Sequence, residues 1–300
     1  MNKVKILTDT CSDLTGDLLK EYDIDYCHMN TVFHGRQQPA SLTWEYFTEH
    51  EFYETMRNNE RYLMTQVSVE EFTKVFTKYL DQGMDIVYIG CSTKQSGSVN
   101  TATTLSKELI AKYPNQKIFC IDALRASIGE GMLAIKAADE AKESKDSETI
   151  YKDIMSVRNN LNQFITVGSL TWLQKAGRVK SSAAFFGNLL GVKPILIADC
   201  DGAQTPIKKV KGRPNSVKEI VMMLKNVILD ADKQTVWICE GDCKKEEIDS
   251  LIQMIKTEIN PKDVKVVPVG PIIGASCGPD TLGVWAFGKT VTYSFENKTK

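Results

Sequence analysis

The segment richest in groups that can bind an anion is residues 91–98, which read Cys-Ser-Thr-Lys-Gln-Ser-Gly-Ser. It follows an apolar run and precedes a stretch with helical spacing. Small hydroxyl residues and Gly97 let the backbone approach a ligand closely, and the start of a helix offers N–H donors and a favourable dipole. A carboxylate or a phosphate fits such a loop. The alternative is that Ser96 only caps the helix.

Two further loops carry hydroxyl groups at the same kind of position. Residues 8–14 follow the first apolar run, and either Ser12 or Asp13 is expected to cap the next helix if neither binds a ligand. In the second loop, Ser68 is a predicted helix cap, which leaves Thr65 available for a ligand. The 91–98 segment is not a P-loop, because the Gly-x-x-x-x-Gly-Lys-Ser/Thr order is absent.

Arg178 is a candidate for holding an acidic group, since it follows Gly177 in a loop and its guanidinium can bind a carboxylate or phosphate with two hydrogen bonds. The alternative is a surface ion pair. The apolar run 183–192 could form the wall of an apolar pocket or a buried core helix.

The sequence offers no evident base for a nucleophile. The three histidines, His28, His34 and His50, all lie in the first 50 residues, away from the loops described above and from Cys277. A serine or cysteine nucleophile needs such a base, so hydrolase and protease functions are disfavoured. We expect no catalytic residue, no metal site and no cofactor.

Alternating apolar runs and helical spacings predict an α/β protein with a mainly parallel sheet in its first half. The predicted strands there are residues 4–7, 85–90 and 117–122, and the predicted helices are 70–80, 98–113 and 129–143. In the second half, the Asp201-Gly202 turn between two apolar stretches predicts a hairpin and therefore antiparallel strands.

Further strands are expected in this half at 162–169, 235–239 and 264–269, with helices at 216–230 and 244–259. We place an N-terminal lobe that carries the ligand-binding loops at 1–160 and a C-terminal α/β lobe at 161–300. The last predicted strand, within 284–295, could pack back on the first lobe.

Composition limits the possible partners. The chain has 300 residues and a formal net charge of -1, so no overall positive field attracts nucleic acid or an anionic membrane. No apolar run approaches the roughly 20 residues that span a bilayer, and the N-terminus lacks a signal-peptide pattern. The 8 cysteines are scattered without a disulfide-framework spacing, so reduced thiols and a cytoplasmic location are expected.

Seven segments, taken together and in this order, resemble one known family. They are residues 8–13, 66–72, 96–98 with 101–102, 122–131, 177–179, 193–196 and 270–279. The chain is similar in these segments to the DegV family of fatty-acid-binding proteins, which includes the B subunits of bacterial fatty-acid kinase. The resemblance implies a two-lobed protein that buries an acyl chain between its lobes.

The resemblance also implies roles for single residues. Ser96 and Gly97, with Thr65, would hold the fatty-acid carboxylate, while Arg178 and Ser276 would face the head group or a partner. The partner would be an ATP-dependent kinase subunit that phosphorylates the bound long-chain fatty acid, so this chain would be a carrier and not an enzyme.

Three positions depart from the family pattern. Ala176 stands where the first glycine of a Gly-Gly-Arg pattern is expected, while Arg178 is kept. Met64 stands where a threonine ligand is expected, and Ser276 stands in place of a histidine, so it cannot carry a positive charge near a phosphate. Two other functions therefore stay open. One is a lipid-binding or small-acid-binding sensor that does not support phosphorylation, and the other is an independent enzyme acting on a small anionic metabolite.

Overall fold

The computed structural model describes residues 2–179 and 191–298. The chain forms two compact units, of which the first comprises Met1–Tyr46 with Tyr62–Arg158 and the second comprises Phe47–Arg61 with Asn159–Lys300. The boundary after Arg158 lies close to the predicted one at residue 160. The sequence pattern did not reveal that residues 47–61 belong to the second unit.

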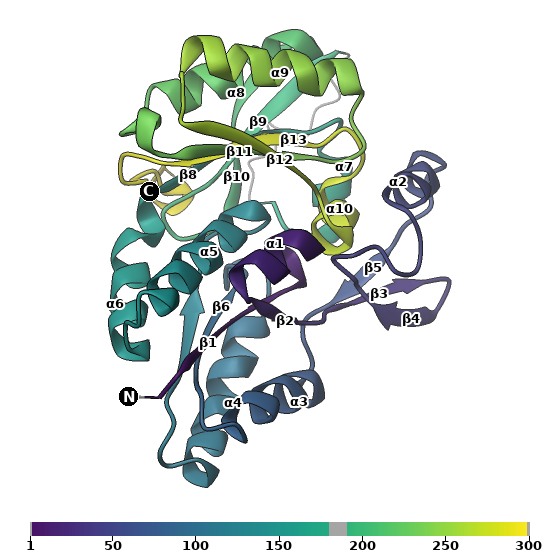
Figure 1. Ribbon diagram of the computed structural model, residues 1–300. Helices are drawn as coiled ribbons and strands as arrows, with labels where there is room; N and C mark the ends of the chain where they lie inside the picture. Colours follow the sequence, from purple (N-terminus) through teal and green to yellow (C-terminus); the bar gives the residue numbers. More distant parts are fainter. Residues whose placement is uncertain (1, 180–190, 299–300) are drawn as a thin grey trace. The chain divides into compact units, whose positions relative to one another are not determined.

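The first unit contains a four-stranded sheet in the order β2-β1-β6-β7, and all its neighbouring strands are parallel (Figure 1). Its strands are β1 (Val4–Asp9), β2 (Asp25–Cys27), β6 (Asp85–Gly90) and β7 (Ile118–Asp122). Strand β1 is inside the sheet, with β2 on one side and β6 on the other, so the order of the strands reverses at β1. Ligands of open parallel sheets bind where the order reverses in this way, beyond the carboxyl ends of the strands.

Helices cover both faces of this sheet. They are α1 (Gly16–Tyr22), α3 (Val69–Leu80), α4 (Ser98–Lys112), α5 (Ile128–Lys142) and α6 (Ser147–Val157). Helices α5 and α6 contact each other and the strands, as do α3 and α4. Every residue of β6 is buried, which is why the sequence of this strand is a nearly continuous apolar run and not an alternating one. The predicted parallel sheet and its helices are confirmed.

Local sequence signals explain where several of these helices begin. Helix α3 starts after Ser68, whose Oγ accepts a hydrogen bond from the Glu71 N–H at 3.1 Å, as predicted. Helix α1 is capped by Thr15, whose Oγ1 accepts from the Leu18 N–H. The expectation that Ser12 or Asp13 caps this helix is therefore wrong.

A small antiparallel sheet completes the first unit, in the order β4-β3-β5. Its strands are β3 (Asn30–Phe33), β4 (Arg36–Pro39) and β5 (Leu63–Thr65). The turn between β3 and β4 has positive φ at both His34 and Gly35. Strand β5 leads into α3, so this sheet places the residues just before that helix.

The second unit contains a six-stranded mixed sheet in the order β10-β9-β8-β13-β11-β12 (Figure 1). Its strands are β8 (Leu161–Thr166), β9 (Val192–Ala198), β10 (Gln204–Lys211), β11 (Thr235–Glu240), β12 (Asp263–Pro268) and β13 (Leu282–Phe287). The predicted hairpin is confirmed as β9 and β10, joined through Gly202 at a φ of 85°. Residues 183–190 of the predicted apolar wall lie outside the described residues.

The strand predicted within residues 284–295 overlaps β13 (Leu282–Phe287). Strand β13 lies inside the second sheet, where it pairs antiparallel with both β8 and β11. These two ladders satisfy its backbone hydrogen bonds on both sides, and its residues Leu282 to Ala286 are buried.

The remaining helices of the second unit are α2 (Glu49–Arg57), α7 (Thr171–Ala176), α8 (Arg213–Lys225), α9 (Lys245–Glu258), α10 (Pro271–Cys277) and α11 (Phe295–Lys298). Helices α8 and α9 contact each other and pack on the sheet around an apolar core. Helix α2 opens with a complete capping box between Thr48 and Glu51. None of the helices in the described part of the chain is long and apolar enough to cross a membrane.

Candidate functional site

The loop that follows β6 is held in place by a hydrogen bond to a buried carboxylate, that of Asp9 at the end of the neighbouring strand β1. Asp9, at the end of β1, is completely buried. Its Oδ1 accepts from the Cys11 N–H at 2.9 Å, while its Oδ2 accepts from the Tyr88 hydroxyl at 2.7 Å and from the Cys91 N–H at 3.4 Å. One side chain therefore ties together the loops after β1 and β6, which are the two loops at the point where the strand order reverses.

A second carboxylate holds the same loop from the other side. Asp122 ends β7, and its Oδ2 accepts from the Thr93 hydroxyl at 2.5 Å and from the Thr93 N–H at 3.3 Å. The Ser92 N–H donates to the carbonyl oxygen of Arg125 at 2.9 Å. The 91–98 loop is thus anchored to both of its neighbouring strands, which favours a fixed shape for the residues that follow.

Ser96 lies at the centre of a short chain of hydrogen bonds. Its Oγ accepts from the Ser98 N–H at 3.2 Å and lies 2.9 Å from the Ser98 Oγ. The Ser98 Oγ in turn accepts from the Val67 N–H at 3.2 Å. When Ser98 donates to Ser96, both acceptor positions of Ser96 are used, and its own hydroxyl hydrogen is available to an anion.

The capping alternative for Ser96 is only partly correct. Gly97 is the N-cap residue of α4, and no side chain caps it. Ser96 accepts from the first N–H of the helix, that of Ser98, and so satisfies one of its unpaired donors. This role uses an acceptor position of Ser96 and leaves its donor function unaffected.

Gly97 permits a close approach of the Gln66 side chain, and its backbone angles do not demand glycine, since its φ is -84°. A Cβ at this position would lie 2.1 Å from the Oε1 of Gln66. The Nε2 of Gln66 donates to Thr101 on α4 at 2.9 Å. The loop before α3 and the start of α4 are therefore packed directly on each other, which brings the predicted residues Thr65, Ser96 and Gly97 into one region.

Thr65 uses its hydroxyl group within the protein. Its Oγ1 donates to the Gln66 carbonyl oxygen at 3.0 Å and accepts from the backbone N–H and the side-chain Nδ2 of Asn30, both at 3.3 Å. Thr65 is also paired with Asn30 in the β3–β5 ladder. To donate to a carboxylate, Thr65 would have to give up its hydrogen bond to Gln66.

A second buried carboxyl group lies beside Asp9, and sequence reasoning missed it. Glu130, near the start of α5, is completely buried, and its Oε1 accepts from the Thr8 hydroxyl at 2.7 Å and the Asp9 N–H at 3.4 Å. Burial, followed by the charge of Asp9, raises the pKa of Glu130 well above its usual value. Burial also raises the pKa of Asp9, against a hydrogen bond from Tyr88. The sequence signal that could have indicated a buried Glu130 is its position between Gly129 and Gly131, in a helix with a buried face.

One candidate in the second unit, Arg178, comes just after α7, and the other, Ser276, is on α10, which packs on α7. Arg178 follows Gly177, which ends α7 at a φ of 68°, and its exposed guanidinium donates to the Ala176 carbonyl oxygen at 3.0 Å. Ser276 is on α10, where its Oγ donates to the Ile272 carbonyl oxygen at 3.4 Å. Neither contact blocks a head-group role for these two side chains.

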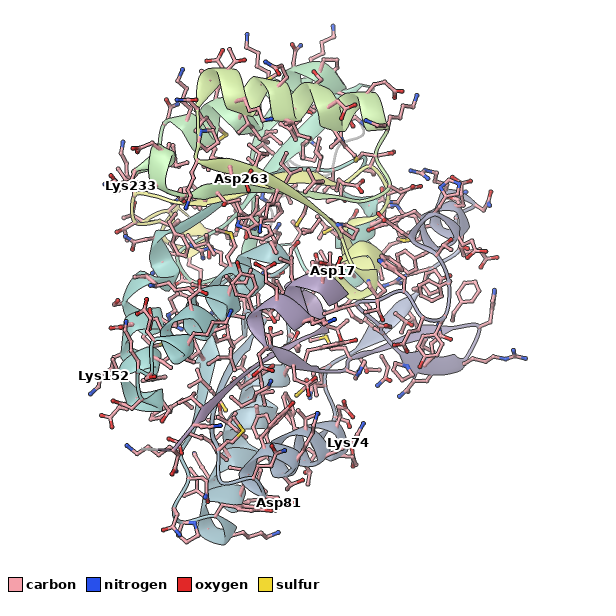
Figure 2. All side chains as sticks on the ribbon, in the orientation of Figure 1. Asp17, Lys74, Asp81, Lys152, Lys233 and Asp263 are labelled. Carbon is pink, nitrogen blue, oxygen red and sulfur yellow. The ribbon has the colours of Figure 1, made fainter. Side chains whose placement is uncertain are left out.

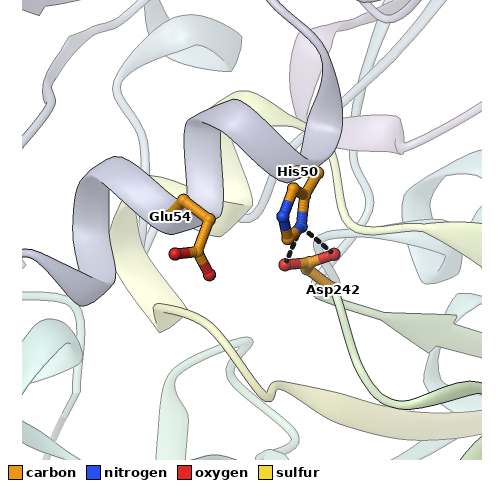
Figure 3. A group of neighbouring side chains, drawn as sticks. All are labelled: His50, Glu54 and Asp242. Atoms are coloured by element: carbon orange, nitrogen blue, oxygen red, sulfur yellow. Dashed lines mark hydrogen bonds and ion pairs between the residues drawn. The ribbon is translucent and has the colours of Figure 1, made fainter.

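Three side chains of kinds that bind metal ions lie together, two of them on α2 and one in the loop after β11. His50 and Glu54 are one turn apart and, with Asp242, place their ligand atoms within 4.8 Å of one another (Figure 3). The Arg57 guanidinium contacts Asp242 and donates to Glu54 at 2.8 Å, and His50 hydrogen-bonds Asp242 at 3.0 Å. Arg57 thereby supplies the positive charge that a metal ion would bring, so the arrangement is explained as an ion-pair network.

Charged side chains of both signs alternate on the outside of each unit. Figure 2 shows Lys74, Lys152 and Lys233 at the periphery of the ribbon. Each has a carboxylate partner one turn away on its own segment. These three lysines are therefore paired locally with acidic side chains.

Comparison with known proteins establishes the family. The DegV family model matches residues 3–289. A DegV domain-containing protein of Clostridium perfringens is 32% identical over 290 residues, which cover 97% of this chain and 99% of that protein. This chain belongs to the DegV family. The family expected from the seven segments is therefore confirmed.

Solved DegV structures share the fold. A DegV lipid-binding protein from Thermotoga maritima has a TM-score of 0.84 at 25% identity, covering 97% of this chain and all of that one. A second Thermotoga maritima protein, for which a fatty-acid-binding function was found, has a TM-score of 0.83 at 25% identity, covering 96% of this chain and 100% of that one. A fatty-acid-binding DegV protein from Thermus thermophilus is 22% identical and has a TM-score of 0.86. The match covers 96% of this chain and 100% of that one. The α/β architecture is thus that of the DegV fold.

Met64 and Ser276, two of the departures from the DegV pattern, occur in regular secondary structure. Met64 is in β5, opposite Thr31 of β3, and is only partly buried. Ser276 is in the last turn of α10. Both elements form normally with these residues, so any effect of the departures would be on ligand chemistry and not on the fold.

Proposed function

We propose that this DegV-family protein binds a long-chain fatty acid and holds its carboxylate at the loop that contains Ser96 and Gly97. The observation that carries the proposal is the Ser96 hydroxyl, whose acceptor positions can both be filled by Ser98 while its hydrogen stays available. A carboxylate is an acceptor only, so it needs such donors. The fatty-acid binding found for one of the Thermotoga maritima proteins and for the Thermus thermophilus protein supports the same ligand class.

The energetics divide between the two ends of the ligand. Each methylene that leaves water contributes roughly 0.8 kcal/mol, so an acyl chain supplies most of the affinity. The polar loop then sets which end of the ligand binds where. On this proposal the acyl chain lies between the two lobes, Thr65 assists Ser96, and Arg178 and Ser276 face the head group or a partner.

We further propose a carrier role, in which an ATP-dependent kinase subunit phosphorylates the bound fatty acid. The resemblance to kinase B subunits supports this role, and the lack of an evident catalytic base in the sequence is consistent with it. Ser276 favours the second candidate, a binding or sensing protein that does not support phosphorylation, because a serine hydroxyl cannot carry positive charge beside an acyl phosphate.

The first experiment is mass spectrometry of an organic extract of the purified protein, combined with melting curves in added palmitate. A ligand that binds only the folded state raises the melting temperature with concentration. We expect a co-purifying fatty acid and a concentration-dependent rise. If neither is seen, the proposed ligand is wrong.

The second experiment tests the carboxylate site and the carrier role separately. Ser96→Ala should weaken palmitate binding by about tenfold, since a hydrogen bond to a charged group is lost. Ser156→Ala is the matched control, because Ser156 is exposed on α6 and donates only to the Asp153 carbonyl oxygen. Acyl-phosphate formation that depends on both an added fatty-acid kinase and ATP would support the carrier role, while binding without it would support the sensor.

A further inference from the structure

We infer that Ser98 is a positioning residue that turns the Ser96 hydroxyl hydrogen toward the ligand and so makes the site select a carboxylate over an uncharged head group. This inference rests on the proposed function and adds the origin of its selectivity. It follows from three hydrogen bonds, of which one joins Val67, before α3, to Ser98 and two join Ser98 to Ser96.

The first step is that the Ser98 Oγ is committed as an acceptor. Ser98 and Val67 are both fully buried. The Val67 N–H donates to the Ser98 Oγ at 3.2 Å, and a buried N–H without an acceptor is strongly disfavoured. The position of the Ser98 oxygen is therefore fixed by the backbone that leads into α3.

The second step concerns the direction of the hydrogen bond between the two serines. The Ser98 Oγ lies 2.9 Å from the Ser96 Oγ, so its hydrogen can be donated to Ser96. The Ser98 N–H also donates to the Ser96 Oγ, at 3.2 Å. Ser96 then accepts two hydrogen bonds from one residue, and its only hydrogen is directed away from Ser98.

The third step links this geometry to ligand choice. A carboxylate can only accept, so it binds well to a hydroxyl that is already turned to donate. Each bond in the chain from Val67 through Ser98 to Ser96 also polarises the next, which strengthens the terminal donor. A fatty alcohol can either donate or accept, and it therefore gains less from a fixed donor.

The test measures affinities for palmitate and for hexadecanol in wild type and variants, at a pH where palmitate is ionised. The ratio of the two affinities reports on the head group, because changes in the acyl-chain site affect both ligands alike. We expect Ser98→Ala to lower the ratio about fivefold to tenfold. Ser98→Cys, which keeps a similar size but donates weakly, should do the same, and Ser98→Thr should restore the ratio.

Two controls separate positioning from simple loss of structure. Ser106→Ala removes another buried hydroxyl from the same helix, one that donates to the Thr103 carbonyl oxygen at 2.9 Å, and it should leave the ratio unchanged. The double variant Ser96→Ala/Ser98→Ala should have the same ratio as Ser96→Ala alone, because Ser98 acts through Ser96.

An unchanged ratio in Ser98→Cys, or fully additive effects in the double variant, would overturn the inference. If Ser98→Ala does not fold, the cysteine and threonine variants still decide the question. A wild-type protein that binds neither palmitate nor hexadecanol would instead refute the proposed function, and that outcome is distinct from a failure of the Ser98 variants.

Discussion

The hydroxyl of Tyr53 donates a hydrogen bond to the carbonyl oxygen of Val269 at 2.7 Å, and this contact joins α2 to the loop before α10. Tyr53 is fully buried, and its ring tip also lies against Gly241 and Gly274, where a Cβ would come within 3.1 and 2.6 Å of the hydroxyl oxygen. A segment from the first quarter of the sequence is thereby built into the second unit.

Removing this hydroxyl should destabilise the second unit. Tyr53→Phe leaves the Val269 carbonyl without its partner, and we expect a loss of about 1–2 kcal/mol in the free energy of unfolding. Urea denaturation followed by circular dichroism measures it. Tyr46→Phe, at a residue that is 50% exposed, is the control and should change little. Equal effects of the two substitutions would show that the hydrogen bond to Val269 contributes nothing.

Gly278, just after α10, should tolerate no side chain. Its φ is 81°, and a Cβ there would lie 2.1 Å from the Trp172 ring. Gly278→Ala therefore combines backbone strain with a clash against a ring, and we expect a loss of about 3 kcal/mol or more. Gly35→Ala has a similar φ of 75° but open space around it, so it should cost only the strain, about 1 kcal/mol. Thermal unfolding of the two variants should separate strain from steric overlap, and equal shifts would contradict the clash.

Glu49 should make the second unit less stable as the pH rises. Burial and the nearby charge of Glu240 raise the pKa of Glu49 from 4.5 to about 8. The folded state then holds a proton that the unfolded state releases, so stability is greatest below the unfolded pKa of 4.5 and falls as the pH rises toward 8. Glu49→Gln should flatten this dependence in urea unfolding between about pH 5 and about pH 8. A variant with the wild-type slope would exclude Glu49 as its source.

Glu130 should likewise make the first unit less stable as the pH rises. Its folded pKa is raised above 4.5, chiefly by burial, so its contribution to stability is complete below pH 4.5 and is lost as the pH rises above it. Glu130→Gln mimics the protonated form and can still accept from Thr8. We expect this variant to be at least as stable as wild type at neutral pH and to show a smaller pH dependence by calorimetry. Strong destabilisation at neutral pH would mean that the ionised form is needed instead.

Much of the fold could be predicted because its signals are local. The apolar run of β6, the capping serine of α3 and the Asp201-Gly202 turn each depend on a few adjacent residues, and all three predictions are confirmed. A helix cap is harder to predict where several neighbouring residues could serve as the N-cap. For α1 the N-cap is Thr15 and not Ser12. The Thr-x-x-Glu spacing at 48–51 is a local signal of the same kind, and it forms the capping box of α2.

The sequence by itself determined the family, the parallel sheet and the hydroxyl-rich loops, because these follow from the order and spacing of residue types. Only the tertiary structure decided that Ser96 is held by Ser98 and Val67, that Asp9 ties together the loops after β1 and β6, and that β13 lies between β8 and β11. Each of these contacts joins residues whose relation depends on how strands and helices pack in space. Spacing along the chain placed Ser96 in a hydroxyl-rich loop, but its hydrogen bonds to Ser98, and the one that Ser98 accepts from Val67, depend on how the segment before α3 packs on the start of α4.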